Sequence, residues 1–365
     1  RDSCSTAEIN PLFSDSVYID RLSRIPAIME MPYNDIIRKF IDMYAGRLRN
    51  QVSFMLSACN FYMPIFEEAL DAYGLPLELR YLPIIESALN PSAVSRAGAS
   101  GLWQFMIGTG KIYGLESNSL VDERRDPIKA TWAAARYLKE MYDIYGDWNL
   151  VIAAYNCGPG TINKAIRRAN GETDYWKIYN YLPKETRGYV PAFIAANYVM
   201  TYYCDHNICP METNIPASTD TVQVNKNLHF EQIADLCNVP LDQIKSLNPQ
   251  YKKQMIPGDS KPYTLRLPID AISTFIDKQD TIYAHRADEL FRNRKTVAIK
   301  EITPSTRKTT TAVAGKGKLT YYTIKSGDTL STIAGKYGVT IKDIQRWNGM
   351  SNTKIAAGKR LKIYK

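Results

Sequence analysis

The sequence predicts a multidomain protein, in which an all-α domain is followed by two small βααβ modules. Apolar residues recur at helical spacing through the first two hundred residues. In the C-terminal half, a module of about fifty residues occurs twice, at an offset of one hundred residues. With 365 residues and 45% hydrophobic content, the chain is long enough for several packed domains and has the composition of a globular protein.

The helical domain is expected to span residues 17–210, after an N-terminal tail at residues 1–16. Its helices are expected where apolar residues recur at helical spacing and Gly, Pro or Asn stand at the ends. These stretches are residues 61–73, 126–145, 149–156, 159–169 and 186–203. The composition turns to Pro, Asn, Ser and Thr over residues 205–219, which marks the exit from this domain.

The repeat defines the C-terminal half. Each copy has a β-like start, two short amphipathic helical stretches and a β-like end. Matching positions include Ile233 and Ile333, Val239 and Val339, Ile244 and Ile344, and Asn248 and Asn348. We therefore expect modules at residues 219–268 and 319–365. The segment 269–318 is expected to be a linker, partly helical and basic.

The net charge of +9 favours an anionic partner, for which nucleic acid, anionic lipid and an acidic cell-wall polymer are the candidates. Much of the excess lies in the linker without regularly interleaved aromatic residues, so we predict no nucleic-acid partner. No apolar run approaches the roughly 18 to 20 residues that a membrane-spanning helix needs, and no transmembrane segment is predicted. Six Cys residues lack zinc-type spacing; Cys204 and Cys209 are candidates either for a disulfide or for buried free thiols.

Glu86 is the most informative single residue. It closes the apolar run Leu82–Ile85, and no further Asp or Glu occurs until Glu116. An apolar environment raises the pKa of a carboxyl group, which then stays protonated near neutral pH. Glu86 is therefore a candidate general acid.

Several other chemistries are excluded. The three His residues, at positions 206, 229 and 285, lie at or beyond the end of the helical domain. A Ser/His/Asp site or a His-based zinc site in that domain is thus excluded, and we expect neither metal nor cofactor. Glycoside cleavage fits a lone acid, but it also needs a second carboxylate or a group of the substrate in its place. The second carboxylates that folding can bring near are Asp122, Glu123, Asp126 and Glu185.

The second module resembles a LysM domain, a family that binds glycans containing N-acetylglucosamine. The resemblance rests on the run Tyr322–Leu330 and on matching positions through Gly358. It implies a shallow glycan-binding groove formed by Gly327, Asp328, Thr329, Leu330, Lys354 and Ile355. The first module has Asn225–Phe230 where the Gly-Asp-Thr-Leu run is expected, so the alternatives are that it binds glycan or that it merely packs against the rest of the protein.

The helical domain carries a second resemblance. Its motifs are Glu86-Ser87, Gly98–Met106, Ala154-Tyr155-Asn156 and Glu185–Val190, in this order. Together they resemble the lysozyme-like catalytic domain of lytic transglycosylases. The resemblance is to the membrane-bound lytic murein transglycosylase D type, which joins such a domain to C-terminal LysM repeats.

This resemblance implies that Glu86 cleaves the bond between N-acetylmuramic acid and N-acetylglucosamine, acting first as acid and then as base. The muramic 6-hydroxyl attacks C1 and leaves a 1,6-anhydro end. The implied substrate-binding residues are Ser87, Gln104, Tyr155, Asn156, Glu185 and Tyr189, with Tyr189 reaching the catalytic carboxyl or a sugar hydroxyl. The implied partner is peptidoglycan in the bacterial cell envelope, most naturally in the periplasm, with any membrane anchor in a segment outside this sequence.

Two alternatives remain at this point. A hydrolase of lysozyme type uses the same fold and substrate but adds water. A non-catalytic wall-binding protein retains Glu86 without turnover. The sequence leaves open endo or exo action, preferred glycan length and oligomeric state.

Overall fold

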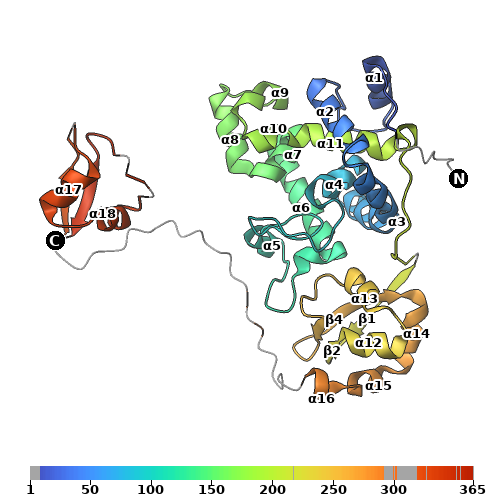
Figure 1. Ribbon diagram of the computed structural model, residues 1–365. Helices are drawn as coiled ribbons and strands as arrows, with labels where there is room; N and C mark the ends of the chain where they lie inside the picture. Colours follow the sequence, from blue (N-terminus) through green and yellow to red (C-terminus); the bar gives the residue numbers. More distant parts are fainter. Residues whose placement is uncertain are drawn as a thin grey trace. The chain divides into compact units, whose positions relative to one another are not determined.

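A computed structural model describes residues 9–216, 218–291, 299, 301, 319–325, 327–350, 352–353 and 355–364. The chain forms two compact units, Arg1–Ile302 and Thr303–Lys365 (Figure 1). The helical domain and the first module belong to the first unit, and the second module belongs to the second. No helix among the described residues is both long and apolar enough to cross a bilayer.

The first part of the chain is helical, as predicted. Its helices are α1 (Asp15–Ser23), α2 (Asp35–Ala45), α3 (Arg49–Ala72), α4 (Leu82–Ser87), α5 (Ile107–Ile112), α6 (Pro127–Tyr145), α7 (Trp148–Cys157), α8 (Pro159–Arg168), α9 (Tyr175–Ile178), α10 (Lys184–Arg187) and α11 (Tyr189–Thr201). The expected helix at 61–73 is the second half of α3, and that at 186–203 is divided between α10 and α11. Helix α2 was missed although Asn34 caps it by accepting from the N–H groups of Ile36 and Ile37.

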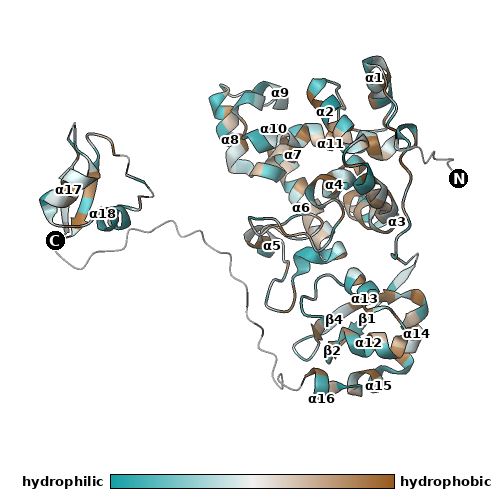
Figure 2. Cartoon of the chain, in the orientation of Figure 1, coloured by the Kyte–Doolittle hydropathy of each residue, from teal (hydrophilic) through white to brown (hydrophobic). Residues whose placement is uncertain are grey.

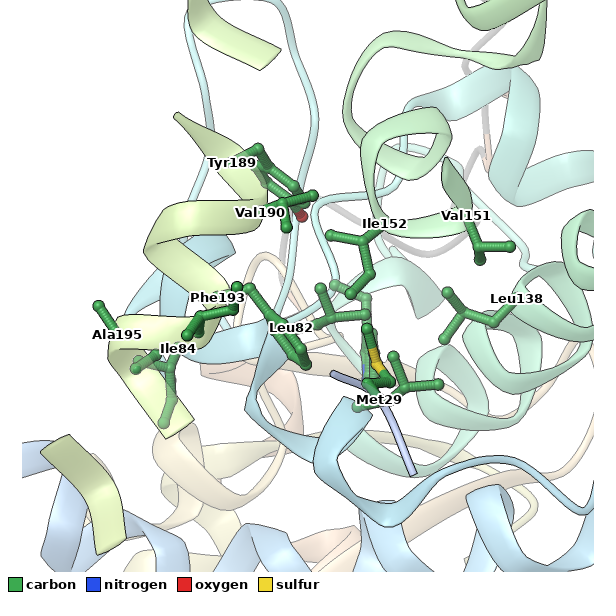
Figure 3. Close-up of a cluster of buried hydrophobic side chains, with 14 of the residues drawn as sticks. Met29, Leu82, Ile84, Leu138, Val151, Ile152, Tyr189, Val190, Phe193 and Ala195 are labelled. Atoms are coloured by element: carbon green, nitrogen blue, oxygen red, sulfur yellow. The ribbon is translucent and has the colours of Figure 1, made fainter. Parts of the chain in front are cut away.

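The core of the helical domain surrounds α11. This helix is apolar on nearly all sides and packs against α2, α4 and α7. Figure 3 shows Val190 and Phe193 of α11 close to Leu82 of α4. Leu82 and Ile84 are buried, so the start of α4 is fixed in the core while its last turn carries Glu86.

The first module has the predicted βααβ order with one addition. Strand β1 (Thr219–Val224) pairs antiparallel with β4 (Tyr263–Pro268), and α12 (Phe230–Cys237) and α13 (Leu241–Leu247) lie between them in sequence. The addition is a short antiparallel pair, β2 (Asn227–His229) with β3 (Met255–Pro257).

The first part of the expected linker is folded onto this module. Helices α14 (Ile269–Asp277) and α15 (Gln279–Ala284) bury Phe275 and Ile282 in the core of the module, and α16 (Ala287–Leu290) follows. The basic remainder of the linker, apart from residues 299 and 301, is outside the described residues.

The first module packs against the helical domain through the loop between α5 and α6. Leu120 and Val121 of this loop belong to the apolar core of the module. The backbone N–H of Lys252 donates to the carbonyl of Leu120 (2.8 Å), and Lys261 forms an ion pair with Glu116 (2.6 Å). The first module therefore packs against the rest of the protein.

The second module is a βααβ unit. Strands β5 (Leu319–Thr323) and β6 (Arg360–Tyr364) pair antiparallel, and α17 (Leu330–Tyr337) and α18 (Ile341–Asn348) each begin with a Thr capping box. Figure 2 marks α18 as largely hydrophilic, while Ile344 and Trp347 on this helix are buried in the core of the module.

Candidate active site

A cavity of about 600 Å³ lies at the C-terminal end of α4. Five of the seven residues predicted for the catalytic site line it: Glu86, Ser87, Gln104, Glu185 and Tyr189. The rest of the lining is mostly apolar and includes Phe40, Met43 and Tyr44 of α2 and Met55 of α3. Residues that are distant in the sequence therefore meet around one half-buried carboxyl group.

The end of α4 determines where Glu86 lies. The helix stops at Ser87 because Ala88 (φ 52°) and Leu89 (φ 58°) both adopt left-handed conformations. Such a conformation costs a residue with a side chain about 1–2 kcal/mol. Burial of Leu89, which is 1% exposed, offsets part of that cost.

The electrostatic environment of Glu86 favours its neutral form. Burial raises the pKa of Glu86 to about 7; the hydrogen bond from Tyr189 acts in the lowering direction and the charge of Glu185 in the raising direction. The Tyr189 hydroxyl donates to Oε1 of Glu86, as the sequence predicts. A carboxyl with a pKa near 7 can donate a proton and also take one back at neutral pH.

The donor groups of Ser87 and Gln104 are hydrogen-bonded to backbone carbonyls in the cavity wall. The Ser87 hydroxyl lies 3.0 Å from the carbonyl of Pro83 and 2.9 Å from that of Leu102, while Nε2 of Gln104 donates to the carbonyl of Gly101 (2.8 Å). Their hydrogens thus serve the protein backbone. What they offer a ligand is acceptor capacity, at the Ser87 Oγ lone pairs and the Gln104 amide oxygen.

Tyr155 and Asn156 were expected to line the cleft together with Glu86. Neither is among the residues around the Glu86 cavity. The Tyr155 hydroxyl donates to the carbonyl of Trp103 (2.7 Å), and Oδ1 of Asn156 accepts from the hydroxyl of Thr186 (2.9 Å). Burial is the main cause that raises the pKa of the Tyr155 hydroxyl, and the charge of the nearby Glu86 raises it further.

Trp103 belongs to the core. Its side chain is fully buried and Nε1 donates to Oγ1 of Thr131 (2.9 Å), so its ring is not available to stack on a sugar.

The four candidates for a second carboxylate differ in whether they lie at the cavity of Glu86. Asp122 forms a buried ion pair with Arg124 (2.7 Å), and Glu123 accepts from the N–H of Glu116 (2.8 Å). Asp126 caps α6. Glu185 is the one member of this set that lines the cavity, where it is exposed.

Sequence reasoning missed Arg124, which holds the loop that carries Gln104. Its NH1 donates to the carbonyls of Gly98 (2.8 Å) and Phe105 (2.9 Å). Its Nε and NH2 donate to the two carboxylate oxygens of Asp122. Gly101 (φ 89°) is required here, because an added Cβ would lie 1.7 Å from the carbonyl oxygen of Arg124. The sequence signal was the spacing of Asp122 and Arg124, but their loop partners are apparent only after folding.

In the second module, the predicted glycan-binding residues mostly serve the fold of the module. Oδ2 of Asp328 accepts from the N–H of Lys325 and from the hydroxyl of Tyr322, both at 2.8 Å, and these bonds lower the pKa of Asp328. Three further predicted residues belong to the framework of the module: Thr329 caps α17, Leu330 is buried and Ile355 is half-buried against the core. Gly327 (φ 88°) has open space around it, and Lys354 is outside the described residues.

Two smaller expectations concern cysteines and metals. Cys204 and Cys209 are not joined by a disulfide in the structure. Within the described part of the chain, no cluster of three or more His, Cys, Asp or Glu side chains has the arrangement of a metal site.

Comparison with family models matches three parts of the chain. Residues 63–178 match the Transglycosylase SLT domain, residues 218–284 the LysM-like domain of lytic transglycosylase MltD, and residues 322–363 the LysM domain. The second of these ranges includes α14 and α15, which the sequence had suggested were linker.

Two curated relatives and one solved structure are described as lytic transglycosylases. Membrane-bound lytic murein transglycosylase D of Escherichia coli (strain K12) is 32% identical over 341 residues, which cover 92% of this chain and 70% of the relative. Soluble lytic murein transglycosylase of the same organism is 33% identical over 124 residues, covering 32% and 19%. The crystal structure of the 70 kDa soluble lytic transglycosylase from Escherichia coli is 29% identical with a TM-score of 0.34, and the match covers 42% of this chain and 26% of that one.

The match to the first of these relatives runs through the helical domain and the modules, along most of both chains. The chain therefore belongs to the lytic transglycosylases of the membrane-bound lytic murein transglycosylase D type, enzymes that cleave peptidoglycan.

Proposed function

We propose that this protein cleaves the β-1,4 bond between N-acetylmuramic acid and N-acetylglucosamine without consuming water, leaving a 1,6-anhydro-muramic end. Glu86 acts as the single acid and base. The observation that carries this proposal is a carboxyl with a pKa near 7 at the wall of a cavity, while three of the four other candidate carboxylates have structural partners elsewhere.

In the first step, protonated Glu86 donates its proton to the glycosidic oxygen and the bond from that oxygen to C1 of the muramic sugar breaks. N-acetylglucosamine leaves with a free 4-hydroxyl. In the second step the carboxylate takes the proton from the muramic 6-hydroxyl, whose oxygen bonds to C1. Glu86 ends protonated, and no water has been added.

Tyr189 supports both steps through its hydrogen bond to Glu86. A hydroxyl donates more strongly to an ionised carboxylate than to a neutral acid. Tyr189 thus stabilises the carboxylate that exists between the two proton transfers and holds it in place. Ser87, Gln104 and Glu185 offer acceptors for sugar hydroxyl and acetamido N–H groups.

The pH dependence of kcat/KM tests the acid role. Because the active free enzyme carries protonated Glu86, kcat/KM should be level at low pH and fall as the pH rises through about 7. A Tyr189→Phe variant removes a hydrogen bond that lowers the pKa of Glu86. Its decline should therefore move to higher pH, even though its maximal rate is reduced. An unchanged midpoint would contradict the coupling of Tyr189 to Glu86.

Product analysis separates the two enzymatic alternatives. Digestion of purified sacculi in water enriched in heavy oxygen should release muropeptides whose new ends lack one water and carry no label. Labelled reducing ends would instead support a hydrolase, with Glu185 at the cavity as its second carboxylate.

We further propose that the second module holds the enzyme on glycan strands through the backbone around Gly327, since the Asp328 and Leu330 side chains are engaged within the module. Deleting residues 319–365 should lower binding to sacculi by about 10²-fold through loss of effective concentration. Turnover of short soluble fragments should change little, because this module belongs to a separate unit. Equal binding of the shortened chain in a sedimentation assay would refute the anchor.

The place of action follows from the substrate. We propose that the protein works in the bacterial cell envelope, in the periplasm, where peptidoglycan is accessible. The name of the Escherichia coli relative describes that protein as membrane-bound. Fractionation of cells producing the complete gene product tests this location.

A further inference from the structure

A second cavity of about 1,080 Å³ adjoins the catalytic cavity. The two share Gln51, Ser87 and Ala88 in their linings, so they meet at these residues. We infer that the second cavity binds the glycan strand beyond the bond that is cleaved, and that the first LysM-type module forms its outer wall. This inference rests on the proposed function and identifies a specificity element for it.

The floor of the second cavity is aromatic. Phe54, Phe61 and Tyr62 of α3 line it, and Phe54 keeps 37% of its surface exposed. An aromatic ring presents an apolar face that can cover the apolar face of a sugar ring. An exposed Phe in a cavity next to a glycosidase-type carboxyl therefore suits a sugar of the same strand.

The side wall is the connector between the helical domain and the module, and it is fixed along α3. The Ser53 hydroxyl donates to the carbonyl of Cys209, the Ser57 hydroxyl donates to that of Met211, and the N–H of Met211 donates to the carbonyl of Ser53 (3.2 Å). The connector residues that follow, 212–215, line the cavity. This wall is thus held in place by hydrogen bonds within the protein.

Helix α13 closes the outer end. Nε2 of Gln243 donates to the carbonyl of Asn214 (3.1 Å), which ties α13 to the connector. Ser246 and Leu247 of the same helix line the cavity. The module is also held at the α5–α6 loop, so two separate attachments keep α13 beside the second cavity.

The polar lining suits the hydroxyl and acetamido groups of a glycan. Asn90, Ser92, Asn214 and Gln243 supply amide and hydroxyl groups of the kind that bond sugar hydroxyl and acetamido groups. Glu212 and Asp242 in the lining are both exposed, and Asp242 is paired with Lys245 (3.1 Å). Ligand sites commonly measure about 300–1,000 Å³, so the two cavities together hold more of a polymer than the sugars at the cleaved bond.

The first module is tightly packed where the second module carries its Gly327 loop. The short strands β2 and β3 pair directly, and a Cβ added at Gly258 would lie 2.3 Å from the carbonyl oxygen of Lys226. We therefore assign the contribution of this module to α13, which lines the second cavity.

The test uses a bulky residue on each of two exposed helix positions of the same module. Ser246→Trp fills the second cavity from α13, while Ser273→Trp places the same side chain on α14, which lines neither cavity. The full-length variants are assayed on peptide-free glycan tetrasaccharides, on long peptide-free strands and on long strands bearing stem peptides. Ser246→Trp should lower kcat/KM about tenfold on long strands and less than about twofold on the tetrasaccharide, and Ser273→Trp should affect neither.

The tetrasaccharide rate also shows that Ser246→Trp has folded. Equal rates for the two variants on long strands would overturn the inference. So would a length effect that appears only on strands bearing stem peptides, since the occupant would then be peptide. If the length effect appears but the products are reducing ends, the role of the second cavity stands and the lytic mechanism fails. If the products are anhydro ends but no length effect appears, the lytic mechanism stands and the role of the second cavity fails.

Discussion

A Glu86→Gln variant should lose turnover by about 10³-fold or more, because Gln can neither give a proton to the glycosidic oxygen nor take one from the 6-hydroxyl. One residue performs both transfers in the proposed mechanism, so its loss removes both contributions. The measurement is release of anhydro-ended muropeptides from sacculi, followed over time by mass spectrometry.

The fold of this variant should be intact. Gln has nearly the shape of Glu, and its carbonyl oxygen can still accept the hydrogen bond from Tyr189. Binding to sacculi and thermal stability should therefore match the wild type. Glu185→Gln is the companion variant, since Glu185 shares the cavity, and it should lose less than about tenfold. If Glu185→Gln were as inactive as Glu86→Gln, a two-carboxylate mechanism would replace the one proposed.

An Arg124→Met variant should destabilise the helical domain by about 3–5 kcal/mol, the usual cost of leaving one partner of a buried ion pair alone. Asp122 is 1% exposed and would keep only the more distant ammonium of Lys252, at 4.0 Å. The carbonyls of Gly98 and Phe105 would also lose their donor. Urea unfolding followed by circular dichroism measures the change.

Two comparisons isolate the buried pair. Adding Asp122→Asn to Arg124→Met removes the uncompensated charge and should recover part of the lost stability. Arg136→Met removes an exposed arginine that pairs with Glu140 one helical turn away, and it should cost no more than about 0.5 kcal/mol. A loss in Arg124→Met as small as that in Arg136→Met would show that the loop is held by other contacts.

Part of the site could be predicted because its signals are local. Glu86 was identified from an apolar run and an acid-free stretch, and its raised pKa follows from the same burial. Arg124 could not be identified this way, since two of its four acceptor atoms are the backbone carbonyls of Gly98 and Phe105, which lie 26 and 19 residues away in the sequence. The role predicted for Tyr155 stays a prediction, since its hydroxyl donates to the carbonyl of Trp103 and it is not among the residues that line the Glu86 cavity.

The fold shows the same division. The repeat predicted both βααβ modules, because their apolar spacing is independent of their neighbours. The assignment of residues 269–284 to a linker failed because α14 and α15 find their apolar partners only in the folded module. The loop at Leu120 and Val121 gave no sign in the sequence that it would complete the core of a module more than one hundred residues later.

The left-handed conformations of Ala88 and Leu89 end α4, and this helix end has an electrostatic effect on Glu86. Because the helix stops at Ser87, Glu86 stands in its last turn, next to the carbonyl groups at the C-terminal end of the helix. These carbonyls form the negative end of the helix dipole, which disfavours a negative charge beside them by about 0.3–1 kcal/mol. The polarity of its own helix therefore favours the acid form of Glu86, in addition to the apolar residues that cover it.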